Sequence, residues 1–136
     1  MEVALGVTWE PNATEARLTA TDQGTATLRL SAHPDDLDSL DVLLSWGSVR
    51  SARMEPPNDE AIAGHRLYDA GLRQIRWIGE VIGSSLIAEI EHGNRSHPRH
   101  DPLRYAQLRH WIVPLKECTV EVVAETLSWH REAATL

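Results

Sequence analysis

Residues 55–72, EPPNDEAIAGHRLYDAGL, interrupt a chain that otherwise alternates between apolar and polar residues, and they decide where its strands stop. Pro56 and Pro57 lack a backbone N–H and cannot join the hydrogen-bond ladder of a sheet, so a strand that reaches them must end. Asn58 then stands where a helix N-cap would, with acidic residues in the first turn, where a helix favours negative charge. We therefore predict a break between strands, followed by a short helix near 58–64.

The polar side chains of this stretch fit two interpretations. If the helix continues through the whole stretch, Ala61, His65 and Tyr68 lie on one stripe and pack against the core. Alternatively, a loop stiffened by the two prolines presents Asn58 and Asp59 beside His65 and Tyr68. Loops held by a rigid scaffold commonly carry acid–base groups, so this alternative predicts a working site.

The order of residues in this stretch also resembles a box found in small uncharacterised bacterial proteins. The box consists of PNDEA, two further residues, GHRLY and then GL, and the later segments EV (80–81), NRSHP (94–98) and RH (109–110) match features of the same family. The similarity covers about half of the chain, from residue 57 to 124. No activity is attached to that family, so the resemblance implies a relative and no function.

Length and composition predict one globular domain over residues 1–136. The single cysteine, Cys118, leaves no internal disulfide and suits a reducing cytoplasm, and no stretch approaches the ~20 apolar residues of a membrane span. The net charge of −7 argues against nucleic-acid binding, which relies on neutralising phosphates. Residues 65–116 are locally basic, with eight Arg or Lys against five acids, which would suit a small anion.

The alternating pattern predicts a β-rich α+β fold of about seven antiparallel strands in a curled sheet or open barrel. A hairpin turns at 22–24, and a helix with Ser84 as its cap covers 84–93. The other expected strands, with a bend at Gly47 in the fourth, are 3–9, 16–21, 25–32, 41–54, 75–82, 107–115 and 118–129.

The last two strands predict their own register. If Leu115 pairs with Cys118, then Trp111 faces Val122 on an apolar face, and Arg109 faces Ala124. The opposite face then carries His110 beside Val123, with Glu121 and Glu125 on the diagonals and Trp129 further along. Apolar walls around titratable groups are typical of small-molecule sites, although a half-exposed strand face has the same pattern.

Glu80 is an unusual carboxylate because it shares a strand face with Ile78 and Ile82. Burial without a partner would raise its pKa, as a general acid requires. A structural ion pair with Arg76 is the alternative, and the sequence leaves both open.

The histidine-rich loop that follows the helix has features of a metal site and of an anion site. His92 and His97 have a zinc-compatible spacing, but no cysteines accompany them, so we predict no metal. Arg95, with other arginines nearby, favours contact with an anion. No Gly-rich phosphate loop or cofactor motif is present, so we predict no cofactor.

We predict a small cytoplasmic enzyme that applies acid–base chemistry to a small polar metabolite, which we expect to be anionic. Hydrolysis, isomerisation, cyclisation and elimination all stay open. The expected catalytic residues are Glu80, His110 and His65. At least two of His65, Tyr68, Glu80 and His110 are expected to line one cavity, with Asn58 or Asp59 at its rim. The expected substrate contacts are Asn58, Asp59, Tyr68, Arg95 and Arg109.

An acidic interaction protein, for example an immunity-type inhibitor of a basic partner protein, is the alternative. Residues 1–64 hold eleven acids against four arginines, and complementary charge accelerates association. This alternative predicts that Trp9 or Trp46 is exposed as an anchor. The sequence does not determine the oligomeric state.

Overall fold

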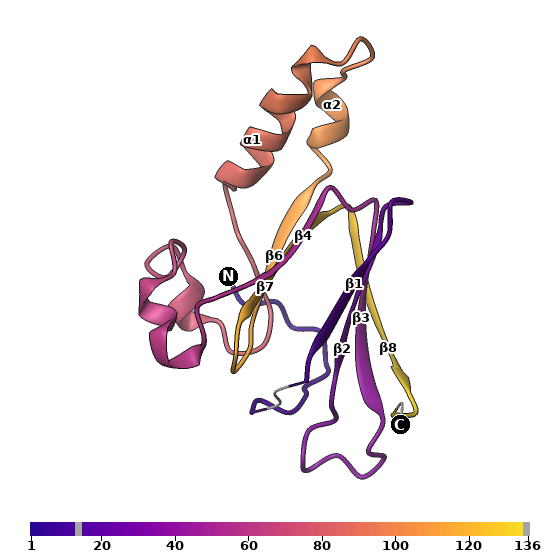
Figure 1. Ribbon diagram of the computed structural model, residues 1–136, viewed down its shortest axis with the longest axis vertical. Coiled ribbons are helices and arrows are strands. Elements are labelled where there is room, and N and C mark those ends of the chain that lie inside the picture. The colour runs from indigo at the N-terminus through magenta and orange to yellow at the C-terminus, as the bar shows by residue number, and fades with distance from the viewer. Residues whose placement is uncertain (13–14, 135–136) are drawn as a thin grey trace.

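Two four-stranded antiparallel sheets dominate the computed structural model, which describes residues 1–12 and 15–134 (Figure 1). The first sheet has the strand order β1-β2-β3-β8, with β1 at Arg17–Ala20, β2 at Thr25–Leu30, β3 at Asp41–Gly47 and β8 at Thr126–Glu132. The second has the order β4-β7-β6-β5, with β4 at Ser51–Glu55, β7 at Thr119–Ala124, β6 at Arg109–Pro114 and β5 at Gly79–Glu80. The β-rich α+β class is thus as predicted.

The two sheets share one apolar core between their facing surfaces. Alternate residues of β2 and β3, such as Leu28 and Leu44, point into it from the first sheet, and Trp111 and Val122 do so from the second. Trp9 closes the core with an exposed fraction of 1%. Because strand side chains alternate between faces, the intervening residues of β6 and β7 lie on the outer face of the second sheet.

Two strand pairs join the sheets at one corner. The β3–β8 pair ends at Gly47 opposite Thr126, and the same two chain segments continue as the β4–β7 pair, which starts with Ser51 opposite Val123. Backbone hydrogen bonds bridge the bend, including Glu125 N to Gly47 O at 3.1 Å. A Cβ at position 47 would lie 2.7 Å from Thr126 Oγ1, so a larger residue there would force Thr126 to shift, and the predicted bend at Gly47 is confirmed.

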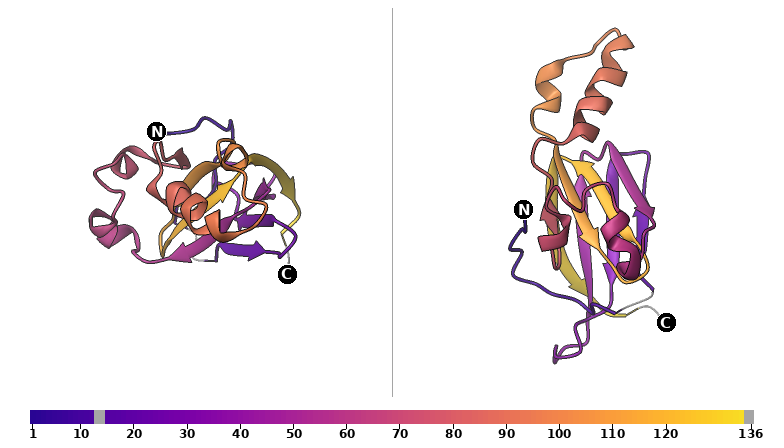
Figure 2. Two further views of the ribbon diagram at one scale, coloured as in Figure 1. Left: turned by 90° about the horizontal axis from the view of Figure 1, so that it is seen from above. Right: turned by 90° about the vertical axis from the view of Figure 1, so that its left-hand side faces the viewer.

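Helical segments cover the outer face of the second sheet and extend past its end (Figure 2). The 3₁₀ helices η1 (Asp59–Gly64) and η2 (Leu72–Gln74) pack an apolar cluster that includes Leu72 and Ile75 against Ile112. Helix α1 (Ser85–Gly93), η3 (Asn94–Ser96) and α2 (Pro102–Tyr105) follow, and Tyr105 packs on Val123. Among the described helices, none has the length and apolar character needed to cross a bilayer.

Several local predictions are confirmed. The 22–24 turn joins β1 to β2, with Gly24 at a φ of +82°, and the register of β6 and β7 pairs Trp111 with Val122 and Arg109 with Ala124. The Ser84 side chain caps α1 by accepting a hydrogen bond from Ile87 N. The Asn58 side chain caps η1 in the same way through Ala61 N, at 3.1 Å.

The prediction of one curled sheet or open barrel is wrong, because the long predicted strands are interrupted. Gly6, at a φ of +77°, breaks the 3–9 segment, which keeps only the isolated bridge between Trp9 and Ala32. The 75–82 segment pairs only at 79–80, since the backbone N–H groups of Arg76 and Trp77 donate to the Glu2 carboxylate. The 118–129 segment bends at Glu125 into the other sheet, which removes Trp129 from the face that carries His110.

The interpretation of one continuous helix through 55–72 is also wrong. The η1 helix ends at Gly64, and the backbone of His65 is extended, at a φ of −71° and a ψ of 139°. His65 and Tyr68 therefore do not share a helical stripe with Ala61. The prolines and the Asn58 cap determine where the helical segment begins. After Gly64, the chain is positioned by the contact of His65 with Glu121 of β7.

Removing the Asn58 cap should destabilise the protein. Asn58→Ala leaves Ala61 N without its acceptor and should lower the free energy of unfolding by about 0.5–2 kcal/mol, whereas Asn58→Ser keeps an acceptor and should recover most of the loss. Urea denaturation of both variants checks this, with exposed Gln74→Ala as the control for loss of an amide. An unchanged Asn58→Ala midpoint would contradict the capping role.

Candidate functional site

A buried carboxylate occupies the centre of the covered face of the second sheet. Glu121 lies on β7, opposite Ile112 of β6 and Arg53 of β4, and its exposed fraction is 5%. Ionised carboxylates are rarely buried to this extent without partners, because removing a charge from water is costly. The surrounding side chains must therefore supply donors to both oxygens.

Three side chains from two segments, the consecutive residues His65 and Arg66 and the strand residue His110, contact the Glu121 carboxylate. Arg66 donates two hydrogen bonds in a bidentate arrangement, from Nη2 to Oε1 at 2.6 Å and from Nη1 to Oε2 at 2.8 Å. His110 Nε2 lies 2.8 Å from Oε1, and His65 Nε2 lies 3.4 Å from Oε2. Burial raises the pKa of Glu121, but the hydrogen bonds from His110 and Arg66 outweigh it and lower the pKa from 4.5 to about 2. Glu121 is therefore an anion at neutral pH.

The charge on Glu121 determines the tautomer of His110. A carboxylate can only accept hydrogen bonds, so Nε2 of His110 carries a proton and donates it. In the neutral imidazole, Nδ1 then has a free lone pair, and it lies 2.7 Å from Ser84 Oγ. The Ser84 hydroxyl consequently donates to Nδ1, and the three residues form one directed chain, Ser84 to His110 to Glu121.

Ser84 is the accessible end of this chain. It lies at the turn between β5 and α1, directly after Gly83, whose φ of +64° reverses the chain. Its hydroxyl also accepts from Ile87 N at 3.1 Å. The residue is half-buried, whereas His110 is exposed by only 1%, so Ser84 is the more solvent-accessible end of the chain.

His65 is held as a neutral imidazole on the other side of Glu121. Its Nδ1 accepts a hydrogen bond from Leu67 N at 3.0 Å, so Nε2 carries the proton and points toward Glu121. Burial lowers the pKa of His65 below 6.5, although the charge of Glu121 partly opposes this. His65 and His110 therefore both contact the Glu121 carboxylate through their Nε2 atoms.

The prediction that Glu80 is a buried acid or a partner of Arg76 is wrong. Glu80 is half-buried and pairs with Arg109, with Arg109 Nε at 3.1 Å from Oε2 and a second, shorter contact to Oε1. The hydrogen bond from Arg109 lowers the pKa of Glu80, the reverse of what a general acid needs. Arg109 also stacks over Trp111 at 5.0 Å, so structural contacts already engage this expected anion contact.

The other expected substrate contacts are dispersed. Asn58 is engaged as a cap, and Asp59 and Tyr68 line a cleft at the β6–β7 turn. Arg95 pairs with Glu91 at 2.9 Å and lines an open groove along α1 that begins at Ser85. Tyr68 and Glu80 therefore lie outside the Glu121 network.

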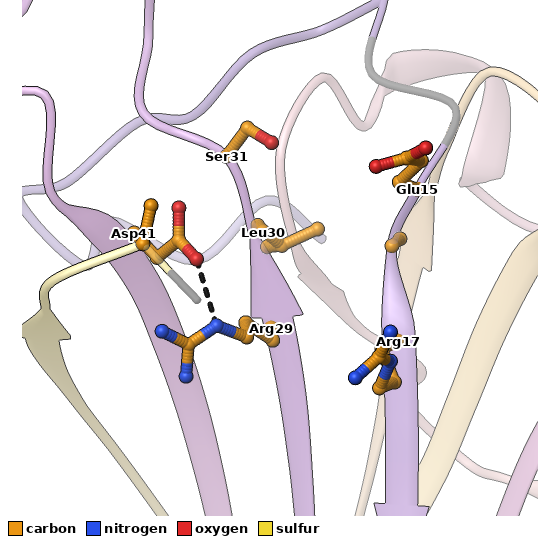
Figure 3. A pocket seen from close by; sticks show the side chains of 8 residues that line it. Glu15, Arg17, Arg29, Leu30, Ser31 and Asp41 are labelled. Atoms are coloured by element: carbon orange, nitrogen blue, oxygen red, sulfur yellow. Dashed lines mark hydrogen bonds and ion pairs between the residues drawn. The ribbon is translucent and has the colours of Figure 1, made fainter. Parts of the chain in front are cut away.

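A third cavity, of about 520 Å³, lies at the ends of β1 to β3 (Figure 3). Arg29 crosses it and donates to Asp41 at 2.7 Å and to Glu132 at 3.1 Å, so its charge is already neutralised. Within residues 1–12 and 15–134, no group of three or more His, Cys, Asp or Glu side chains could hold a metal ion.

The sequence signals for the network were present but incomplete. The strand register placed Glu121 diagonally to His110, and Arg66 directly follows His65 in the chain. Ser84 was recognised only as a helix cap, because capping alone accounts for a serine at that position. The chain shows no match to protein-family models, to curated proteins or to solved structures, so the similarity inferred for residues 57–124 stays a prediction.

The low pKa of Glu121 predicts a loss of stability in acid. The unfolded carboxyl binds its proton near pH 4.5 and the folded one near pH 2, so unfolding takes up a proton between these values and stability falls as the pH drops through this window. The contribution lost is on the order of 3 kcal/mol.

Denaturant titrations between pH 6 and pH 2 measure this contribution as a difference between variants. Glu121→Gln should be less stable than the wild type at pH 6, and the gap should close toward pH 2. Glu117→Gln, which alters an exposed carboxylate outside the network, should leave the profile unchanged. Parallel profiles for the wild type and Glu121→Gln would contradict the low pKa.

Proposed function

We propose that this protein is a hydrolase of ester-type acyl bonds. Ser84 is the nucleophile, His110 is the general base, and Glu121 orients the imidazole and stabilises its protonated form. The observation that carries the proposal is the directed chain, with 2.7 Å from Ser84 Oγ to His110 Nδ1 and 2.8 Å from His110 Nε2 to Glu121 Oε1. A nucleophile within hydrogen-bond reach of a base that a third group orients is the geometric signature of such catalysis.

The chemistry follows from the proton positions. As Ser84 Oγ forms a bond to the carbonyl carbon of the substrate, its proton passes to His110 Nδ1. The resulting imidazolium is stabilised by the Glu121 carboxylate, which stays ionised. The bond from carbon to the leaving oxygen then breaks, and the leaving group takes the proton from Nδ1. Water, deprotonated by the same nitrogen, cleaves the acyl-serine and restores the hydroxyl.

The roles of the two imidazole nitrogens are exchanged relative to the familiar serine protease triad, where Nε2 faces the serine. Both nitrogens belong to one conjugated ring, so a carboxylate at either one raises the basicity of the other. Ser84 also stands at the N-terminus of α1, and the first N–H groups of a helix have no intrahelical acceptor. Such groups can stabilise the oxyanion that forms on the carbonyl oxygen.

Among the four reaction types left open by the sequence, this geometry favours hydrolysis because the imidazole is paired with a hydroxyl. The alternative of an acidic interaction protein was expected to expose Trp9 or Trp46 as an anchor. Their exposed fractions are 1% and 2%, so neither is available to a partner, whereas Trp129 is exposed by 38%. The acyl hydrolase is therefore the hypothesis with the more specific support.

A fluorophosphonate probe, which modifies nucleophilic serines, tests the assignment. Intact-mass measurement should show one adduct on the wild type, and peptide mapping should place it on Ser84. Ser84→Ala should abolish the adduct, and hydrolysis of 4-nitrophenyl acetate should fall at least about 100-fold, the size of a general-base effect. Ser85→Ala removes the exposed neighbouring hydroxyl and should change neither readout.

Two outcomes would reject this function. One is a wild type that takes up no probe under native conditions, and the other is an adduct that persists in Ser84→Ala. Because Ser84 also caps α1, circular dichroism of Ser84→Ala should first verify that the variant is folded.

A further inference from the structure

The cleft at the β6–β7 turn is a second place where side chains converge, at the opposite end of β6 from His110. Its volume is about 330 Å³, within the range of small-molecule sites. The segment from η1 to Arg76 forms one wall, and the turn residues Pro114 and Lys116 form the other. A hydrogen bond of 2.8 Å from Asp59 N to Lys116 O ties the two walls together.

Positive charge gathers in this cleft. Arg73, Arg76 and Lys116 line it, with Asp59 as the one carboxylate among the lining residues, on a chain whose net charge is −7. On so acidic a chain, we would expect nearby carboxylates to form ion pairs with these cations. A local excess of cations on an acidic protein attracts small anions.

The side chains of these three cations have no acidic partner in the described part of the chain. Arg66, Arg95 and Arg109, by contrast, each form an ion pair with a glutamate. The Glu2 carboxylate accepts hydrogen bonds from the backbone N–H groups of Arg76 and Trp77, not from the Arg76 side chain.

Apolar side chains and one phenol line the cleft together with the cations. The apolar ones belong to Ile62, Leu72, Ile75 and Leu115, and the phenol to Tyr68. Within residues 1–12 and 15–134, the Tyr68 hydroxyl has no hydrogen-bond partner, so it is available as a donor. A ligand that matches this surface has an anionic head and an apolar body.

We infer that this cleft binds a small amphipathic anion, an organic phosphate or carboxylate with an apolar group. The head contacts Arg73, Arg76 and Lys116 and accepts from the Tyr68 hydroxyl, while the apolar part covers Leu72 and Ile75. The His110 end of β6 is four residues from Pro114, or about 13 Å of extended strand. The cleft is thus a site separate from Ser84, and its assignment does not depend on the proposed hydrolase.

Calorimetric titration at low ionic strength tests the inference with three probes: phenyl phosphate, inorganic phosphate and benzyl alcohol. The Ser84→Ala protein serves as the background, so that turnover at Ser84 cannot contribute heat. Phenyl phosphate should bind with a dissociation constant in the millimolar range or below, more tightly than inorganic phosphate, and benzyl alcohol should bind weakest, because only the first probe supplies both the head and the apolar body.

Paired charge variants locate the binding. Arg73→Gln with Arg76→Gln should weaken phenyl phosphate binding at least about tenfold, the effect of losing charge-assisted hydrogen bonds. Arg99→Gln with Arg104→Gln removes the same charge from two exposed arginines outside the cleft and should change the dissociation constant by less than about twofold. All four positions are exposed, so both variants should fold.

Three results would overturn the inference. The first is no measurable binding of phenyl phosphate. The second is an equal loss of binding in both double variants, which would mean attraction to net charge alone. The third is equal affinity for inorganic phosphate and phenyl phosphate, which would mean that the apolar lining residues do not contact the ligand.

Discussion

The burial of one carboxylate, Glu121, is the constraint on which the covered face of the second sheet depends. An ionised group with an exposed fraction of 5% is tolerable only if donors reach both of its oxygens. Those donors come from Arg66, His65 and His110, so the 59–76 segment and the sheet must dock together before the charge is satisfied. The cover over the sheet and the polar network beneath it therefore form as one unit.

Side chains of β6 and β7 point alternately to the two faces of the second sheet, so one face contributes to the core and the other carries the polar network. Trp111 and Val122 point into the core between the sheets, while His110 and Glu121 point away from it. Apolar clusters on the outer face, one around Ile112 and one around Val123, flank the network and exclude water from it. Replacing a whole buried ion pair by apolar residues of similar volume is often neutral or stabilising, whereas removing one partner alone is strongly destabilising. Perturbed pKa values of this kind also cluster at functional sites.

The sequence predicted those features that depend on neighbours along the chain. The register of β6 and β7 and the Asn58 cap follow from alternation and from local hydrogen bonding, and both are as predicted. The partner of Glu80 was not predictable, because Arg109 lies on the neighbouring strand β6, 29 positions further along the chain, whereas Arg76 is merely close in sequence. Ser84 combines a cap with a contact to His110, and only the tertiary fold brings that contact about.

The corner between the sheets has a consequence for how this fold tolerates change in length. Two continuous strand pairs pass through the bend at Gly47 and Glu125, so both sheets are held in one common register. A single residue inserted into β7 would rotate every later position of that strand by one face. If the insertion preceded Glu121, its carboxylate would turn into the apolar core and a valine would take its place beside His110. Natural variation in length should therefore be confined to the loops outside this corner.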